Sequence, residues 1–164
     1  ITAATWAGLD DSKKLKPAVR ERLFDIITAE ADAAVGIVDV DEIDRLNILG
    51  ATLKAMAIAI GNLKRRPGFA LIDGNRPPEL SCPVRTVVRG DAKSLSIAAA
   101  SVVAKVTRDR IMQALARDYP GYGWARNAGY GTPEHIAALT RLGPTPVHRR
   151  SFAPIRKILR GDSG

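Results

Sequence analysis

Two aspartates each follow a short apolar segment, and both are suited to holding a hard cation. Asp73 ends the run Phe69-Ala-Leu-Ile-Asp73 and precedes Gly74-Asn75, whereas Asp91 follows Val87-Val-Arg-Gly90 and precedes a long helical pattern. A carboxylate at the end of a buried strand, beside the start of a helix, is well placed to bind a divalent cation. Asp73 also fits a second interpretation, a turn residue that hydrogen-bonds its own backbone. With basic groups around them, the two carboxylates indicate phosphodiester chemistry.

The basic groups lie mostly in the second half of the chain. Residues 1–82 hold eleven Lys and Arg against twelve Asp and Glu, whereas residues 83–164 hold fourteen against five, so the balance changes from −1 to +9. In the helical pattern after Asp91, Ser101, Lys105 and Arg108 are separated from one another by four and three positions, which places them on one side of a helix. Arginine suits phosphate because its planar group donates two hydrogen bonds at once. The asymmetry favours a nucleic-acid partner over a solubilising charge excess.

Three other groups are candidates for chemistry. Asp39, Asp41, Glu42 and Asp44 lack the spacing of a calcium loop, and acids before a helix stabilise its N-terminus, so we expect a structural role for them. His135 and His148 lack the spacing of a metal-binding pair, and we expect neither to be a ligand. The aromatic residues of the glycine-rich stretch 118–131 either stack on a base or sugar or pin an irregular loop to the core; they are Tyr122, Trp124 and Tyr130.

The elements that must position these groups follow from local patterns. We expect strands over 33–38, 69–73 and 84–88, the second of them buried on both faces. We expect helices from Pro17 to about Ala31, from an Asn47 cap through Leu63, over about 94–119, from a Thr132 cap to Leu142, and as a terminal turn at 155–159. In the helix over 94–119, the predicted buried face comprises Ile97, Ala100, Ala104, Ile111 and Leu115. Mixed strands and helices in one unit predict an α/β architecture.

Composition places the protein among soluble globular domains. The 164 residues are 46% apolar and 26% charged, and no window approaches eighteen uninterrupted apolar residues. Cys82 is the single cysteine, which suits a reducing compartment, and the first residues do not form a signal peptide. We therefore expect a monomeric cytoplasmic protein with no membrane segment.

Motifs along nearly the whole chain resemble those of one family, the bacterial type 2 ribonuclease H, or ribonuclease HII. The long central motif R-G-D-A-K-S-L-S-I-A-A-A-S at 89–101 is highly specific and continues as V-V-A-K-V-T-R-D to Asp109. The other matching segments, in the order of the family, are G-L-D-D-S-K-K-L at 8–15, L-I-D-G-N at 71–75, N-A-G-Y-G-T-P-E-H at 127–135 and H-R-R-S-F at 148–152.

The resemblance implies a ribonuclease H-like fold, with a mixed central sheet flanked by helices, in a single domain over residues 1–164 with a basic helical part from about residue 120. It implies a hydrolase, an endonuclease that cuts the RNA strand of RNA–DNA hybrids or cuts at single ribonucleotides in duplex DNA, with Mg²⁺ or Mn²⁺. Asp73 and Asp91 match two of the family's four catalytic, metal-binding carboxylates. The positions matching its nucleic-acid-binding segments are Lys13, Lys14, Lys93 and Tyr130.

The chain departs from the family pattern at its start. The family's first strand carries an Asp-Glu pair followed by a Gly-Arg-Gly turn, and residues 1–7 contain neither. We therefore expect an N-terminally shortened chain without that strand. This leaves an alternative for the chain as given, a non-catalytic nucleic-acid-binding module.

Overall fold

The chain forms two compact units, each with its own hydrophobic core. A computed structural model describes residues 9, 12 and 15–161. The first unit comprises residues up to Ile37 together with Thr52–Thr107, and the second comprises Val38–Ala51 with the residues from Arg108 onward. That residues 1–164 form one ribonuclease H-like domain, with a basic helical part from about residue 120, stays a prediction.

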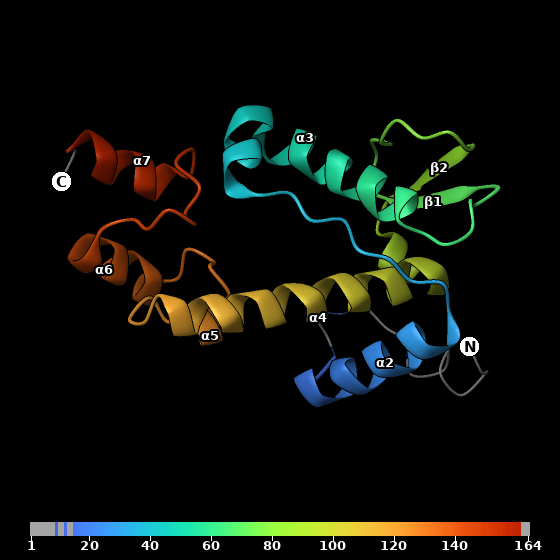
Figure 1. Cartoon of the computed structure of the whole chain (residues 1–164), viewed down its shortest axis with the longest axis horizontal. Helices are drawn as coiled ribbons and strands as arrows, with labels where there is room; N and C mark the ends of the chain where they lie inside the picture. The colour runs from blue at the N-terminus through green and yellow to red at the C-terminus, as the bar shows by residue number, and fades with distance from the viewer. Residues whose placement is uncertain (1–8, 10–11, 13–14, 162–164) are drawn as a thin grey trace. The chain divides into compact units, whose positions relative to one another are not determined.

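The core of the first unit lies between helices α2, Pro17–Glu30, and α4, Leu95–Asp118. Figure 1 shows α2 alongside the first part of α4. Pro17 occupies the first helical turn, where its missing N–H leaves no hydrogen bond unmade. Leu23 and Ile27 of α2 are 1% and 3% exposed, and they recur on one side of the helix, as predicted. They pack against Ala99, Val102, Val103 and Val106.

Helix α4 buries a different side from the predicted one. Ile97 is buried as expected, but Ala100 and Ala104 are exposed and Ile111 is 37% exposed. The buried stripe runs through the larger residues Val102, Val103 and Val106, with Ala98 and Ala99. Alanines recur on every side of this helix, so their spacing does not select a face, whereas valines gain more from burial.

Helix α3, Val40–Gly61, begins earlier than predicted and changes direction at Asn47. Asn47 has φ 62° and ψ 170°, and its Oδ1 accepts hydrogen bonds from the N–H groups of Leu49 at 2.9 Å and Gly50 at 3.2 Å. Asn47 therefore caps the longer part of α3, which confirms that prediction. The shorter part before Asn47 has its own cap, because Oδ1 of Asp39 accepts from the N–H of Glu42 at 2.8 Å.

The predicted strand over 33–38 is wrong, because the structure has no strand there. This segment packs closely on the first-unit part of α3 instead. A Cβ atom on Gly36 would overlap the backbone of Ala55 and Ala59, and the Asn62 side chain donates to the Val35 carbonyl at 3.1 Å. Small residues here allow the chain to approach a helix rather than pair with another strand.

The sheet in the described residues consists of two parallel strands, β1, Ala70–Asp73, and β2, Val84–Val87 (Figure 1). Ala70 pairs with Val84 and Asp73 with Val87, so both strands end at the same edge. Both strands and the α/β architecture are confirmed. Burial on both faces of β1 is wrong: Ala70 and Ile72 are buried, but Leu71 is 40% exposed. Alternation of this kind is typical of a sheet with one covered face.

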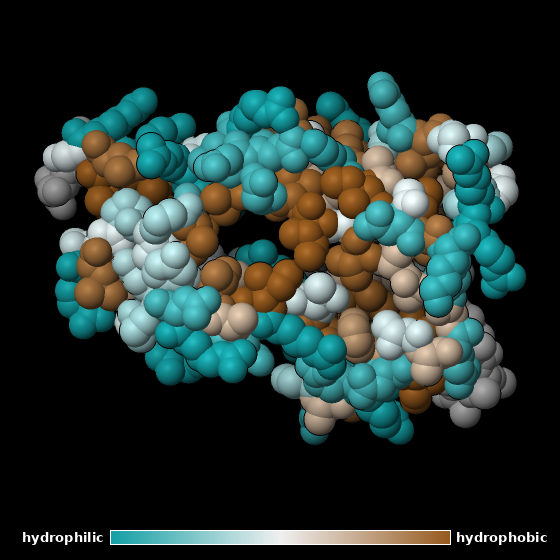
Figure 2. Space-filling view, in the orientation of Figure 1, coloured by the Kyte–Doolittle hydropathy of each residue, from teal (hydrophilic) through white to brown (hydrophobic). Residues whose placement is uncertain are grey.

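In the described residues, the second unit contains three helices besides the first part of α3 and the end of α4. They are α5, Trp124–Asn127, α6, Pro133–Leu142, and α7, Ala153–Arg160. The hydroxyl of Thr132 accepts from the N–H of His135 at 3.3 Å, and α6 stops before Gly143, which confirms the predicted start and end. Both hydrophilic and hydrophobic side chains lie on the surface of α7 (Figure 2), which carries exposed Arg156 and Lys157. The core comprises Met112, Tyr122, Trp124, Ala138, Leu139 and Ile155.

None of the described helices is long and apolar enough to cross a membrane.

Candidate active site and nucleic-acid interface

Asp73 lies at the carboxyl end of β1 and is hydrogen-bonded to a distant segment. Its Oδ1 accepts from the backbone N–H of Gly90 at 2.8 Å, across seventeen positions of the chain. The N–H of Gly74 continues the strand pairing by donating to the Val87 carbonyl at 3.1 Å. The alternative interpretation of Asp73, a carboxylate bonded to its own turn, is therefore wrong.

Asp91 lies in a short 3-10 helix, Gly90–Ala92, that follows β2. Arg89 takes the left-handed conformation, with φ 56° and ψ 47°, and so turns the chain into this helix. Gly90 is buried, and a Cβ there would lie 2.5 Å from Cδ1 of Ile97 and 3.3 Å from Oδ1 of Asp73. A side chain at position 90 would therefore displace Ile97 or the turn where the Asp91 segment meets Asp73.

The two carboxylates each keep one oxygen for a ligand. Oδ1 of Asp91 accepts from the N–H of Ala92 at 3.0 Å, as Oδ1 of Asp73 accepts from Gly90. The second oxygen of each accepts no hydrogen bond from the described part of the chain. Oxygen atoms of carboxylates are the ligands that Mg²⁺ and Mn²⁺ prefer, so the donor set fits a hard divalent cation. Within residues 9, 12 and 15–161, no cluster of three or more His, Cys, Asp or Glu side chains forms a metal-binding group.

Lys93 extends the same segment with a positive charge. Its N–H donates to the Gly90 carbonyl at 3.0 Å, which closes the 3-10 turn, and its side chain is exposed. A small open recess lies here, lined by residues 91–95 with Leu9 and Ala98. Lys93 and Asp91 thus border one recess, which brings an acidic and a basic residue to the same place. Lys13 and Lys14 lie outside the described residues.

Tyr130 belongs to the second unit, and it alone among the three aromatic candidates is exposed. Tyr130 is 58% exposed, whereas Tyr122 and Trp124 are 5% and 3% exposed and stack with ring centroids 5.1 Å apart. The buried pair therefore pins the loop to the core, which is one of the two predicted roles. The exposed Tyr130 ring keeps the other role, stacking on a base or sugar.

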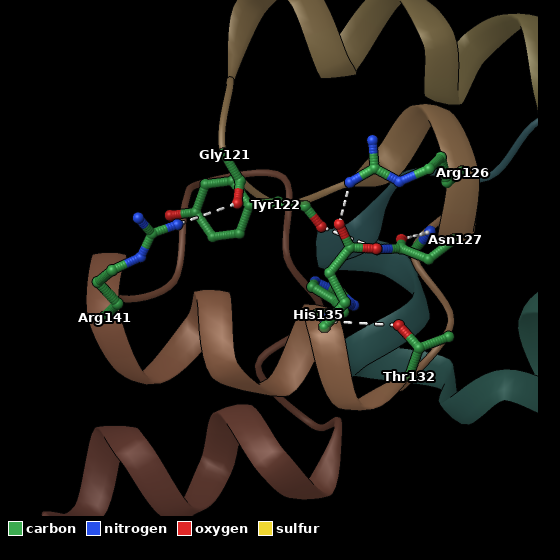
Figure 3. A network of polar contacts seen from close by, with 9 residues as sticks. Gly121, Tyr122, Arg126, Asn127, Thr132, His135 and Arg141 are labelled. Atoms are coloured by element: carbon green, nitrogen blue, oxygen red, sulfur yellow. Dashed lines mark hydrogen bonds and ion pairs between the residues drawn. The ribbon is translucent and has the colours of Figure 1, made fainter.

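The glycine-rich loop is tied down by polar side chains (Figure 3). The amide of Asn127 donates to the Tyr122 carbonyl at 2.8 Å, and Arg126 pairs with Glu134. Arg141 donates to the Gly121 carbonyl at 3.5 Å. These contacts hold both ends of the loop that carries Tyr130.

Arg108 also contacts this loop. It donates to the Ala128 carbonyl at 2.9 Å, and its guanidinium lies 5.8 Å from the centroid of the Tyr130 ring. Among Ser101, Lys105 and Arg108, which were predicted to share one side of α4, Arg108 therefore has a structural contact. Ser101, in the first unit, donates to the Ala98 carbonyl at 2.8 Å.

A pair of buried histidines was not predicted. His135 and His148 are 2% and 7% exposed, and their Nε2 atoms lie 3.2 Å apart. Burial, followed by the nearby His135, lowers the pKa of His148 from 6.5 to about 4. They are separated by thirteen positions, and no local periodicity connects them. Only the fold brings these two rings together.

Asp44 has a structural role that its acidic neighbours do not share. It accepts from the N–H groups of Arg150 at 2.6 Å and Ser151 at 3.0 Å, and from the Ser151 hydroxyl. Burial raises the pKa of Asp44, but these hydrogen bonds and the charge of Arg149 outweigh burial, so the pKa lies below its ordinary 3.8. The basic H-R-R-S-F segment is thereby anchored to the first turns of α3.

Comparisons with known proteins agree on one family. A sequence model of the Ribonuclease HII family matches residues 3–155. Ribonuclease HII of Paramagnetospirillum magneticum is 60% identical over 151 residues, which cover 92% of this chain and 75% of that protein. Ribonuclease HII of Rhodospirillum rubrum is 58% identical over 158 residues, covering 95% of this chain and 72% of that protein.

The fold agrees with a solved structure of the same type. The crystal structure of the ribonuclease H2 from Pyrococcus horikoshii superposes with a TM-score of 0.76 at 26% identity, covering 94% of this chain and 82% of that chain. This likeness confirms the predicted ribonuclease H-like fold. With the family model spanning residues 3–155, it follows that the chain belongs to the ribonuclease HII family of endonucleases.

Proposed function

We propose that the protein cleaves the RNA strand of RNA–DNA hybrids, or cleaves at single ribonucleotides in duplex DNA, by metal-dependent phosphodiester hydrolysis. The observation that carries this proposal is the hydrogen bond from the Gly90 N–H to Asp73, which joins the two acidic segments at one edge of the sheet. Asp91 follows Gly90 directly, and we infer from this that both carboxylates serve one site.

Asp73 and Asp91 would hold Mg²⁺ or Mn²⁺ through their remaining oxygens. Bound divalent cations in such sites activate a water and stabilise the departing 3′ oxygen. The residues of this chain contribute position: Gly90 fixes one oxygen of Asp73, and the Ala92 N–H fixes one oxygen of Asp91. Carboxylates held in this way lose little rotamer freedom on binding a cation.

The nucleic acid would be held by charge and by stacking. Lys93 borders the recess beside Asp91 and is exposed, which suits contact with a phosphate. Lys13 and Lys14 are proposed for the same role. Tyr130 presents an exposed ring that suits packing on the sugar beside the cleaved bond. The excess of arginine in residues 83–164 would add phosphate contacts.

A nicking assay on the 164-residue chain tests the proposal. Three end-labelled substrates are compared: a DNA duplex with one embedded ribonucleotide, an RNA–DNA hybrid and an all-DNA duplex. The expected result is cleavage of the first or second with Mg²⁺ or Mn²⁺, no cleavage of the third, and no cleavage in EDTA. Cleavage of the all-DNA duplex, or cleavage without a metal, would contradict the proposal.

The same assay separates the proposal from the non-catalytic alternative. Binding of the ribonucleotide-containing substrates is measured by fluorescence anisotropy alongside cleavage. Binding without cleavage at any tested concentration of Mg²⁺ or Mn²⁺ would favour a nucleic-acid-binding module for this chain. Binding together with cleavage would exclude the module.

A further inference from the structure

Tyr130 combines an exposed ring with a backbone in which every polar group is bonded. Its N–H donates to the Asn127 carbonyl at 2.9 Å, and its carbonyl accepts from the Thr132 N–H at 2.8 Å. The same carbonyl lies 3.0 Å from Nδ1 of His135. The main-chain polar groups of Tyr130 are thus all bonded, while the residue as a whole is 58% exposed. Because the backbone that carries the ring is already ordered, the ring can contact a ligand with little further loss of conformational entropy.

The protons of both buried histidines follow from their partners. The N–H of Thr145 lies 2.9 Å from Nδ1 of His148, and a backbone N–H can only donate, so Nδ1 accepts and the proton of His148 lies on Nε2. The indole Nε1–H of Trp124 donates to Nε2 of His135 at 3.1 Å, so the proton of His135 lies on Nδ1.

With these assignments, Nε2 of His135 shares its single lone pair between two N–H donors, Trp124 and His148. Nε2–H of His148 donates to Nε2 of His135 across 3.2 Å, and Nδ1–H of His135 donates to the Tyr130 carbonyl across 3.0 Å. The hydrogen bonds that begin at Thr145 therefore run through His148 and His135 to the Tyr130 carbonyl, and the Trp124 indole donates into them at Nε2 of His135.

We propose that His135 and His148 are positioning residues of the nuclease, a directional hydrogen-bond relay that orients Tyr130 for contact with the sugar of the nucleic acid. This inference rests on the proposed function, in which Tyr130 touches the substrate. Burial keeps His148 neutral, with a pKa of about 4, so the relay is intact at neutral pH.

The position of the relay distinguishes it from ordinary core packing. Its last acceptor is the main chain of an exposed residue, not a group of the core. Arg108 donates to the Ala128 carbonyl and lies over the Tyr130 ring. The Tyr130 segment is therefore held through two polar side chains, His135 and Arg108.

Two substitutions of His135 test the contributions of its two ring nitrogens separately. His135→Asn keeps an amide near the position of Nδ1, from which it can donate to Tyr130, but loses Nε2. His135→Gln keeps a polar group near Nε2, towards Trp124 and His148, but loses the donor to Tyr130. Both variants lose one polar position, so their melting temperatures should fall by similar amounts. Thr140→Ala, on the exposed side of the same helix, is the control.

The readout is binding of a duplex with one ribonucleotide, in EDTA, so that it does not depend on cleavage. We expect His135→Gln and Tyr130→Ala each to raise Kd about tenfold, the loss typical of one stacking contact. We expect His135→Asn to recover most of the affinity and Thr140→Ala to bind as the unaltered protein does. Equal losses in His135→Asn and His135→Gln would overturn the proposal.

A double substitution shows whether His135 acts through Tyr130. If it does, adding His135→Gln to Tyr130→Ala raises Kd no further. A second loss of about tenfold in the double variant would overturn the proposal, because independent effects add. Unchanged affinity of Tyr130→Ala would also overturn it.

The tautomers of the two histidines can also be measured without nucleic acid. This measurement tests the relay separately from the proposed function. Imidazole ¹⁵N NMR of the free protein should show His135 protonated on Nδ1 and His148 on Nε2. Other tautomers would overturn the relay even if the duplex binds. The predicted tautomers in a protein that binds no ribonucleotide-containing duplex would overturn the proposed function and, with it, the role of the relay in substrate contact.

Discussion

The backbone N–H of Gly90 donates a 2.8 Å hydrogen bond to Oδ1 of Asp73 and so joins the end of β1 to the turn that carries Asp91. One contact therefore sets the position of both acidic segments. It is close because Gly90 is buried against Ile97 with no room for a side chain. The geometry of the proposed metal site depends on this glycine as much as on the carboxylates.

We predict that Gly90→Ala impairs the site and the fold together. The added Cβ would lie 2.5 Å from Cδ1 of Ile97, so either the isoleucine or the 3-10 turn must move. Overpacking of this kind lowers the free energy of unfolding by about 1–3 kcal/mol, measured by urea denaturation. Any movement of the turn also lengthens the Gly90–Asp73 hydrogen bond and should slow cleavage.

Gly61→Ala is the matched control for that substitution. Gly61 ends α3, and a Cβ there meets nothing within 4 Å. Alanine is a better helix former than glycine, so the variant should be as stable as the unaltered protein or slightly more stable. Equal stability of the two variants would contradict the close approach at Gly90.

We predict that Lys93→Ala weakens binding of every nucleic acid by a similar factor. The side chain is exposed beside the recess that Asp91 lines, where it would neutralise one phosphate. Loss of one phosphate contact reduces the slope of log K against log salt by about 1. Binding titrations at several salt concentrations measure this slope. Lys64→Ala removes the same charge from the turn after α3 and should leave the slope as it is in the unaltered protein. If Lys93→Ala also leaves the slope unchanged, Lys93 lies outside the interface.

We predict that His148 makes the stability of the fold depend on pH. Because its pKa falls from 6.5 to about 4 on folding, the unfolded chain binds more protons between these values. The stabilisation is complete above pH 6.5 and is lost as the pH falls towards 4. A shift of this size corresponds to about 3 kcal/mol.

The measurement compares the unaltered protein with His148→Gln, which cannot titrate. Urea unfolding of both proteins is followed from about pH 7.5 down to about pH 4, the range in which histidine changes its charge. The difference in unfolding free energy should be largest at neutral pH and shrink on acidification. A difference that does not change with pH would show that His148 is not buried in its neutral form.

Local sequence patterns were sufficient to predict an element where the contact that stabilises it lies within a few residues. Thr132 caps α6 through His135, and Asn47 caps its helix through Leu49 and Gly50. The strand ending at Asp73 was predicted from its apolar run. In each case the residue type, its neighbours and the conformation are coupled over one turn, so the sequence carries the information directly.

Contacts between distant residues could not be predicted in this way. Asp44 bonds Arg150, 106 positions away, although its acidic neighbours suggested only a helix N-terminus. His135 and His148 meet because α6 and the following loop fold over Trp124, and neither spacing nor charge marks them. Which side of α4 is buried also depends on its neighbours, because α2 packs against the side that carries Val102, Val103 and Val106.

The central claim is that Asp73 and Asp91 hold the catalytic cations of a ribonuclease. The most direct measurement is the rate of nicking at a single ribonucleotide, with saturating Mg²⁺ or Mn²⁺, for Asp91→Asn beside the unaltered chain. Asparagine keeps the shape and removes the charge, so Asp91→Asn should stay folded and bind the duplex but cleave it at least about a hundredfold more slowly, since removing a group that stabilises transition-state charge costs 10²–10³ in rate. Cleavage by Asp91→Asn at the rate of the unaltered chain would contradict the claim.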